Sequence, residues 1–382
     1  MKIVSIVGAR PQFVKAAMVV EAVRTHNRRP RSSPRVQHIL VHTGQHYDSN
    51  LSGVFFAQLP LPQPRHYLGV GSGSHGKQTG ELLKAVEGVL AKEKPDVALV
   101  YGDTNSTLAG ALAAAKLQIP VAHVEAGLRS FNRTMPEEIN RVVTDHLSST
   151  LFCPTQTAVQ HLEHEGIRRG VYFSGDVMLD AILRFRRVAA RRSRVLSKLD
   201  LFPSEYVLFT MHRAENTDSV QSTAAAMELL LRVQRTVVFP IHPRTQQRLS
   251  TMRGLQKLAK RLFAAGHMRI IKPVPYLDML ALEANARVVL TDSGGVQKEA
   301  YFLRVPCLTL RRETEWTETL EGGWNRLVDP GNGTASLVEG LWNKNGTSPS
   351  SSPPPNLDAF GHGHAANTIV RQLLHSLPHQ RN

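Results

Sequence analysis

Short apolar runs alternate with longer helical patterns along most of the chain. The runs are rich in valine and lack polar alternation, which is typical of strands covered on both faces. The first series of candidate strands comprises KIVSIVG, QHILVHTG, DVALVYGD, PVAHVEAG, STLFCPT and VYFSGD. The second series comprises EYVLFTMH, TVVFPIHP, RIIKPV, RVVLTDSG and VPCLTLR. Because helices lie between these runs, we expect an α/β fold of two doubly wound, Rossmann-like domains facing a cleft.

The first series ends near Asp176, which predicts an N-terminal domain of residues 1–176 and a C-terminal domain of residues 177–363. Residues 364–382 have helical periodicity, and we expect this last helix to join the N-terminal domain. Two segments have the composition of exposed loops: the polar residues 24–35 and the low-complexity residues 344–356.

The chain is strongly basic, with 46 Lys and Arg against 31 Asp and Glu, a formal net charge of +15. Such a charge suits a polyanionic partner. However, we find no zinc-finger spacing, no RNP-like aromatic motif and no helix-turn-helix pattern, so we expect no nucleic-acid partner. The densest basic run, residues 184–194, has the pattern of a solvated helix face. Small phosphorylated substrates account for the remaining charge better than DNA does.

Two cysteines, Cys153 and Cys307, lie far apart in the sequence and indicate neither a disulfide framework nor a zinc site. The first apolar run is too short for a signal peptide, and no run reaches the roughly 18 apolar residues of a membrane span. We therefore expect a cytoplasmic protein without a membrane partner.

Polar clusters follow several strands, at the sheet edge where doubly wound proteins bind ligands. After the first strand, GARPQFVK places Arg10 and Lys15 beside a helix N-terminus, a combination that suits a diphosphate. The alternative is a plain strand-to-helix turn. The spacing G-x-G-x-x-G is not met, so a nicotinamide dinucleotide is not indicated.

Three carboxylates follow strands in the first half. Asp103 and Glu125 each come directly after a strand, and Glu137 follows Pro136 in the first turn of a helix. Asp103 could instead cap the next helix, and Glu137 could simply complement its helix dipole. Three acids converging on one edge can move protons when their pKa values differ. In the helix that carries Glu137, the side chains expected to be buried are those of Ile139, Val142, Val143 and Leu147.

Two His-Arg pairs follow strands in the second half, His212 with Arg213 and His242 with Arg244. They indicate phosphate contacts. No tight ligand spacing accompanies the histidines, so we expect no metal.

A glycine pair follows the strand RVVLTDSG. Ser293, Gly294 and Gly295 would present backbone N–H groups at a helix N-terminus, which suits phosphate. Glu299 lies one turn further along and could accept hydrogen bonds from two ribose hydroxyls.

Taken together, these motifs resemble the non-hydrolysing UDP-N-acetylglucosamine 2-epimerase family. The matching pieces occur in order over nearly the whole chain: GARPQFVK, HTGQHYD, YGDTNSTLAGALAA, HVEAGLRS, MPEEINR, HRAEN, HPRT, TDSGGVQKEA and TEWTETLEGGWNRLV. The resemblance implies a glycosyltransferase-B-like fold, no redox cofactor and a homodimer. It also implies reversible C2 inversion of a UDP-2-acetamido sugar, by elimination of UDP to a 2-acetamidoglucal and re-addition.

The resemblance also assigns roles to residues, with the uracil near residues 274–280. The catalytic set that it implies is Asp103, Glu125, Glu137 and His212. The UDP-binding set is Arg10, Lys15, His212, Arg213, Ser293, Gly294, Gly295 and Glu299.

Alternatives to this substrate and activity remain open from the sequence. The residues of the motifs GARPQFVKAA, HTGQHYDSN and YGDTNSTLAGALAA are closer to those of relatives that act on UDP-2,3-diacetamido-2,3-dideoxy-glucuronate. Asp48 stands where many members have a glutamine at a second, activating substrate site, which makes allosteric activation less expected. A glycosyltransferase of the same fold is a further alternative, as is hydrolysis to free N-acetylmannosamine and UDP.

Overall fold

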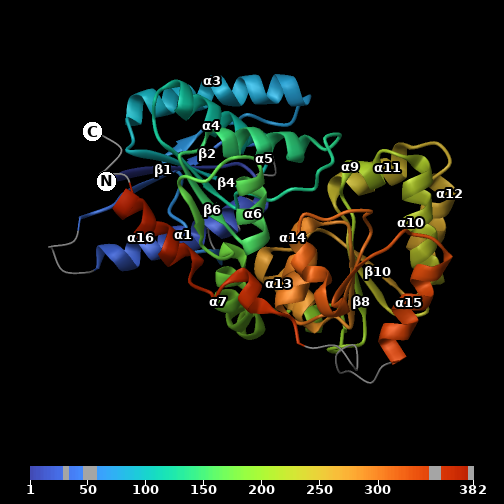
Figure 1. The fold of residues 1–382 in the computed structure, drawn as a ribbon. Helices are drawn as coiled ribbons and strands as arrows, with labels where there is room; N and C mark the ends of the chain where they lie inside the picture. The colour runs from blue at the N-terminus through green and yellow to red at the C-terminus, as the bar shows by residue number, and fades with distance from the viewer. Residues whose placement is uncertain (29–33, 46–57, 344–353, 377–382) are drawn as a thin grey trace. The chain divides into compact units, whose positions relative to one another are not determined.

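The computed structural model describes residues 1–28, 34–45, 58–343 and 354–376 (Figure 1). The chain divides into two compact units. The first unit contains residues 1–183 and 357–382, and the second contains residues 184–356. The C-terminal helix α16 (Ala365–Ser376) therefore belongs to the first unit, where it packs against α1 (Arg10–Asn27).

The first unit is built on a seven-stranded sheet of order β3-β2-β1-β4-β5-β6-β7, in which neighbouring strands are parallel. A strand order that runs outwards from a central β1–β4 pair is that of the doubly wound fold. The strands are β1 (Lys2–Val7), β2 (Gln37–His42), β3 (His66–Tyr67), β4 (Val97–Tyr101), β5 (Val121–Val124), β6 (Thr150–Cys153) and β7 (Val171–Phe173).

The second unit repeats this plan with six strands in the order β10-β9-β8-β11-β12-β13, again parallel. They are β8 (Val207–Thr210), β9 (Val237–Pro240), β10 (Met268–Ile271), β11 (Val288–Thr291), β12 (Cys307–Thr309) and β13 (Asn325–Leu327). The predicted α/β class with two parallel, doubly wound sheets is thus confirmed. The short strands β3 and β13 were not predicted, because their sequences, HY and NRL, contain no apolar run.

Helices flank each sheet (Figure 1). In the first unit, besides α1 and α16, they are α3 (His75–Glu93), α4 (Asn105–Lys116), α5 (Pro136–Leu147) and α6 (Gln156–His164). In the second unit they are α8 (Val195–Lys198), α9 (Ala214–Thr217), α10 (Val220–Arg232), α11 (Pro243–Thr251), α12 (Gln256–Ala264), α13 (Tyr276–Asn285), α14 (Gly294–Phe302) and α15 (Asn332–Asn343). Two 3-10 helices span Thr317–Gly323 and Leu357–Phe360.

Helix α7 (Val177–Arg192) contains the point where the chain passes from one unit to the other. The basic run within and after it is exposed, as expected of a solvated helix face. Its exposed arginines are Arg184, Arg186, Arg187, Arg191, Arg192 and Arg194.

The apolar strands form the core of each unit. Val4 and Ile6 of β1 and Val100 of β4 are fully buried between the helix layers. In the second unit Val207, Phe209 and Leu290 are likewise fully buried in the core. Each such side chain contributes about 1.5–3 kcal/mol by leaving water. These unbroken apolar runs therefore fix the sheets, and the strand ends are left to carry polar groups.

The prediction of a loop over residues 24–35 is wrong in its first part. Residues 24–27 form the last turn of α1, where Arg24 donates a hydrogen bond to the carbonyl of Pro60. Polar composition concealed this turn because the end of a surface helix is itself polar. Most of the predicted low-complexity loop, and Asp48, lie outside the described residues.

The predicted buried face of α5 is wrong for Ile139 and Val143, whereas Val142 and Leu147 are half-buried and Leu147 packs against the core. Ile139 and Val143 are 51% and 38% exposed, whereas Glu138, Arg141 and Asp145 are buried. The helix turns its polar side towards the strand ends, where those side chains find charged partners. The hydrophobic rule therefore fails for the part of this helix in which charged side chains are buried.

Candidate active site

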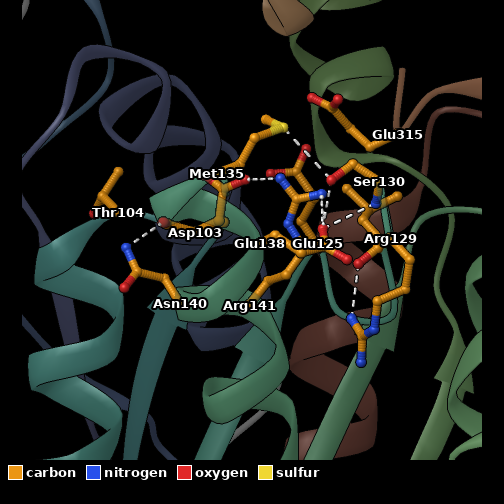
Figure 2. A network of polar contacts seen from close by, with 12 residues as sticks. Asp103, Thr104, Glu125, Arg129, Ser130, Met135, Glu138, Asn140, Arg141 and Glu315 are labelled. Carbon is orange, nitrogen blue, oxygen red and sulfur yellow. Dashed lines mark hydrogen bonds and ion pairs between the residues drawn. The ribbon is translucent and has the colours of Figure 1, made fainter. Parts of the chain in front are cut away.

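The turn after β4 positions Asp103. Gly102 adopts a φ of 62°, a left-handed conformation that favours glycine, and Thr104 then caps α4 by accepting a hydrogen bond from the Thr107 N–H. The interpretation of Asp103 as the helix cap is therefore wrong. Its carboxylate instead contacts Arg141 of α5, with Oδ2 2.6 Å from Nη2 (Figure 2). Asn140 also donates to the Asp103 carbonyl.

The turn after β5 positions Glu125 in a strained backbone conformation. Its φ of 75° is rare for a residue with a side chain and costs on the order of 1 kcal/mol or more. The Glu125 carboxylate forms a buried ion pair with Lys15 of α1. A Cβ placed on Gly102 would lie 3.2 Å from Glu125 Oε2 and 3.6 Å from Lys15 Nζ. The backbone next to Asp103 thus lies directly against the Glu125–Lys15 pair.

Glu137, the third predicted acid, is followed in the sequence by Glu138, and the two side chains have different environments. Glu138 is only 3% exposed and accepts hydrogen bonds from the backbone N–H groups of Ser130 and Phe131 and from the Ser130 hydroxyl. It also pairs with Arg141 at 3.2 Å (Figure 2). Glu137, half-buried, has no hydrogen bond or ion pair to its side chain within the described parts of the chain.

Sequence reasoning therefore missed Glu138 and Arg141. Their spacing of three residues on one helix was the available signal, because such residues lie on the same helix face. Arg141 bridges Glu138 and Asp103, and this bridge attaches α5 to the turn after β4.

The turn after β1 requires glycine at position 8. A Cβ there would come within 2.2 Å of Thr43 Oγ1 and 2.3 Å of Ser106 Oγ. The N–H groups of Gly8 and Ala9 donate to Gln12 Oε1, and the Gln12 amide donates to the Tyr101 carbonyl. The start of α1, which carries Arg10, is thereby locked to the end of β4.

In the second unit, Asp292 organises the strand ends. Its fully buried carboxylate accepts hydrogen bonds from the N–H groups of His212 and Arg213 and from the Asn216 amide. His212 Nδ1 also lies 3.5 Å from Asp292 Oδ1. One carboxylate thus joins the segment after β8 to the segment after β11.

Ser293 and the glycine pair open α14 as predicted. Ser293 is the N-cap and accepts a weak hydrogen bond from the Val296 N–H. A Cβ on Gly294 would lie 2.5 Å from Glu315 Oε1, so this position requires glycine. Arg213 Nη2 lies 3.8 Å from the same oxygen. A helix N-terminus beside an arginine is a suitable environment for phosphate. Glu299 lies within α14, on its buried side.

The second His-Arg pair has a local structural role. The ring Nδ1 of His242 caps α11 by accepting from the Arg244 N–H, and the Arg244 guanidinium pairs with Asp218 on the surface. The rings of His242 and His212 are 5.5 Å apart. A phosphate contact by this pair stays a prediction.

Within the ranges given above, no group of three or more His, Cys, Asp or Glu side chains is arranged to hold a metal ion. Over the same ranges, none of the helices combines the length and apolar character needed to cross a membrane. Cys153 and Cys307 are both buried as free thiols.

Comparison with known proteins places these features in a family. The family model described as UDP-N-acetylglucosamine 2-epimerase matches residues 28–374. A Methanococcus maripaludis protein named UDP-N-acetylglucosamine 2-epimerase homolog is 48% identical, over 98% of this chain and 99% of that protein. The Pseudomonas aeruginosa UDP-2,3-diacetamido-2,3-dideoxy-D-glucuronate 2-epimerase is 47% identical, over 86% of this chain and 88% of its own.

The fold comparison agrees with the sequence comparison. The crystal structure of Methanocaldococcus jannaschii UDP-GlcNAc 2-epimerase in complex with UDP-GlcNAc and UDP is similar with a TM-score of 0.88 and 42% identity. The similarity covers 98% of this chain and 100% of that one. The two parallel sheets and their flanking helices are those of the glycosyltransferase-B-like fold. The chain is an isomerase that belongs to the UDP-N-acetylglucosamine 2-epimerase family.

Proposed function

We propose that this enzyme inverts C2 of UDP-N-acetylglucosamine, giving UDP-N-acetylmannosamine, by elimination and re-addition of UDP. The observation that carries the proposal is the pairing of Asp103 with Arg141 and of Glu125 with Lys15 at one sheet edge. The C2 hydrogen of the sugar is not acidic, because no carbonyl is adjacent to it. Positive character at C1, as UDP departs, makes removal of this proton possible, and a carboxylate must accept it.

Asp103, Glu125 and Glu137 are assigned to proton transfer at C2. Lys15 and Arg141 hold the first two carboxylates as charged acceptors in fixed positions. Glu137 projects from the same helix as Arg141, while its neighbour Glu138 fastens the preceding loop. This division between adjacent glutamates leaves Glu137 available to exchange a proton with the sugar.

UDP recognition is assigned to the α14 N-terminus with Arg213 and His212, with Glu299 on the ribose and residues 274–280 near the uracil. Two N–H groups, a cation and the helix dipole stabilise the charge that UDP gains as a leaving group. This stabilisation applies to bound UDP in both directions of the reaction. Arg10 and Lys15 remain predictions as additional diphosphate contacts.

The direct test is solvent exchange at C2. Purified protein is incubated with UDP-N-acetylglucosamine in D2O and followed by proton NMR, with protein-free substrate as the control. We expect UDP-N-acetylmannosamine to appear and deuterium to enter C2 of both epimers. Epimer without label would exclude proton exchange with solvent, and the absence of both epimer and label would exclude this substrate.

A second substrate has its own support. The 47% identity to the Pseudomonas aeruginosa enzyme favours UDP-2,3-diacetamido-2,3-dideoxy-glucuronate as an alternative sugar for the same reaction. The two substrates are compared at equal concentration in the NMR assay. The higher kcat/KM identifies the preferred sugar.

We also propose that the enzyme acts as a homodimer in the cytoplasm, as the family resemblance implies. Sedimentation equilibrium is expected to give twice the chain mass of 42.3 kDa. A monomer mass across micromolar concentrations would contradict the dimer.

A further inference from the structure

His123 is a buried residue of β5 that no step of the proposed reaction uses. Its side chain is fully buried, and both ring nitrogens have close partners. Nδ1 lies 2.7 Å from Asp145 Oδ1, and Nε2 lies 2.7 Å from the carbonyl oxygen of Gly102. The ring thus joins α5, through Asp145, to the turn that follows β4.

These partners determine where the protons on the ring are. A backbone carbonyl oxygen can only accept a hydrogen bond, so Nε2 must carry a proton. Burial alone would raise the pKa of Asp145, but His123 and Arg129 outweigh it and hold that pKa below its usual range. Arg129 and the Gly127 N–H also contact Asp145 Oδ2, so Asp145 is an acceptor. Each ring nitrogen of His123 therefore faces an acceptor oxygen, which is the geometry in which both nitrogens donate.

Asp145 belongs to a longer series of buried ion pairs. Asp145 also pairs with Arg129 at 2.7 Å, and Arg129 makes a two-bond contact with Glu165. The result is a chain of alternating charges, in the order His123, Asp145, Arg129, Glu165. Buried ion pairs of this kind persist when each charge has a partner and its hydrogen bonds are made.

This series of ion pairs also holds the backbone segments that carry Asp103 and Glu125. The Gly102 N–H donates to the Val124 carbonyl, and the Gly102 carbonyl accepts from His123, so both backbone polar groups of this residue are held. Asp145 accepts from the N–H of Gly127, two residues after Glu125. The backbone that carries Asp103 and the backbone that carries Glu125 are therefore attached to one buried centre.

We propose that His123 is a positioning residue whose doubly protonated ring, by donating to Gly102 and to Asp145, sets the position of Asp103 relative to Glu125. This inference rests on the proposed function, because it assumes that these two acids exchange the C2 proton. Rates of such reactions are sensitive to placement: a displacement of about 1 Å can cost about 100-fold.

Two substitutions separate the two hydrogen bonds. In His123→Asn the amide nitrogen matches Nδ1, so the donor to Asp145 is kept and the donor to Gly102 is lost. In His123→Gln the amide nitrogen matches Nε2, so the donor to Gly102 is kept. We expect kcat for C2 exchange to fall about 100-fold in His123→Asn and at least several-fold less in His123→Gln. Affinity for UDP, measured by calorimetry, should stay within about twofold in both.

His38→Asn is the matched control. His38 is a half-buried histidine of the same sheet, on β2, and its ring Nε2 hydrogen-bonds with the Ser5 hydroxyl. We expect this variant to lower the melting temperature without changing kcat of the folded protein. If His123→Asn behaves like His38→Asn, or if His123→Gln loses as much kcat as His123→Asn, the proposal is wrong.

A measurement on the unaltered enzyme covers the case in which the variants do not fold. Nitrogen-15 NMR of histidine-labelled protein should show one ring with protons on both nitrogens that exchange slowly with water. The His123 ring is assigned by nuclear Overhauser contacts with the residues around Asp145, which requires no variant. A neutral His123 ring at the assay pH would overturn the proposal. A wild-type enzyme that binds UDP but exchanges no C2 proton would instead contradict the proposed function.

Discussion

The edges of the two sheets hold their candidate residues by different means. At the edge of the first sheet, side-chain cations hold the acids: Arg141 holds Asp103, and Lys15 holds Glu125. At the edge of the second sheet, a single buried carboxylate, Asp292, gathers backbone N–H groups from the segment that carries His212 and Arg213. The first edge is therefore set by charge balance and the second by backbone geometry.

This difference matches the demands of two kinds of chemistry. Proton transfer needs carboxylates in defined charge states, and neighbouring cations provide these. Recognition of a diphosphate needs N–H donors in a fixed array, which a helix N-terminus provides without any change in ionisation. Substitutions at the first edge should consequently change turnover, and those at the second edge should change affinity for UDP.

The largest effect is expected for Asp103→Asn. The amide keeps the shape of the side chain but cannot take a proton, so we expect kcat to fall about 1,000-fold, within the range for loss of acid-base catalysis. The UDP dissociation constant, measured by calorimetry, should stay within about threefold. A parallel loss of UDP affinity and kcat would break the comparison.

Glu299→Ala tests the second edge. Loss of the carboxylate that we propose accepts hydrogen bonds from the ribose should weaken UDP binding by about 10- to 100-fold, as expected for bonds to a charged group worth about 1.5–3 kcal/mol. At saturating UDP-sugar, kcat should change much less. Steady-state kinetics with calorimetry separates these quantities, and an unchanged UDP affinity would remove Glu299 from the binding set.

The adjacent glutamates of α5 sharpen the comparison within the first edge. Glu137→Gln should lower kcat about 100-fold with little change in melting temperature. Glu138→Gln should reduce the free energy of unfolding by about 1–3 kcal/mol. The buried Glu138 carboxylate accepts three hydrogen bonds and pairs with Arg141, and the amide removes its charge. The reverse pattern would exchange the roles of the two residues.

The smallest effect is expected at the surface of the second unit. Hydrogen bonds from Arg244, then its charge and that of Arg248, lower the pKa of the exposed Asp218 below its ordinary value. A lowered pKa in the folded state contributes stability above the ordinary value near 4, and this stability is lost as pH falls through the folded-state pKa.

Asp218→Asn should therefore lose stability at pH 7 and lose nothing relative to wild type at the lowest pH. Because solvent screens the pair, the expected loss is below about 1 kcal/mol. Denaturant unfolding at several pH values measures it. A larger loss, or one that grows as the pH falls, would contradict this account of the pair.

The sequence predicted the fold and the positions of the candidate residues well. Unbroken valine-rich runs identified the buried strands, and the residues after them, such as Asp103 and Glu125, necessarily lie at a sheet edge. Gly294 and Ser293 were also placed correctly, because a glycine pair after a strand indicates a helix start. These features depend on local pattern and on the geometry of parallel sheets.

The partners of these residues could not be predicted in the same way. Lys15 and Glu125 are 110 positions apart, and Asp103 and Arg141 are 38 apart. Such pairs arise only when the sheet brings the strand ends together. The burial of polar residues on α5 has the same origin, since Arg141 pairs with Asp103 and Asp145 pairs with Arg129, and both partners come from other segments.

The central claim is that the first edge performs the chemistry and the second binds UDP. Its most direct test is calorimetric titration of UDP into a variant in which Asp103, Glu125 and Glu137 are all replaced by their amides, after its folding is verified. The account predicts a UDP dissociation constant within about threefold of wild type, together with complete loss of C2 exchange. A loss of UDP affinity of about 30-fold or more, about 2 kcal/mol, would contradict it.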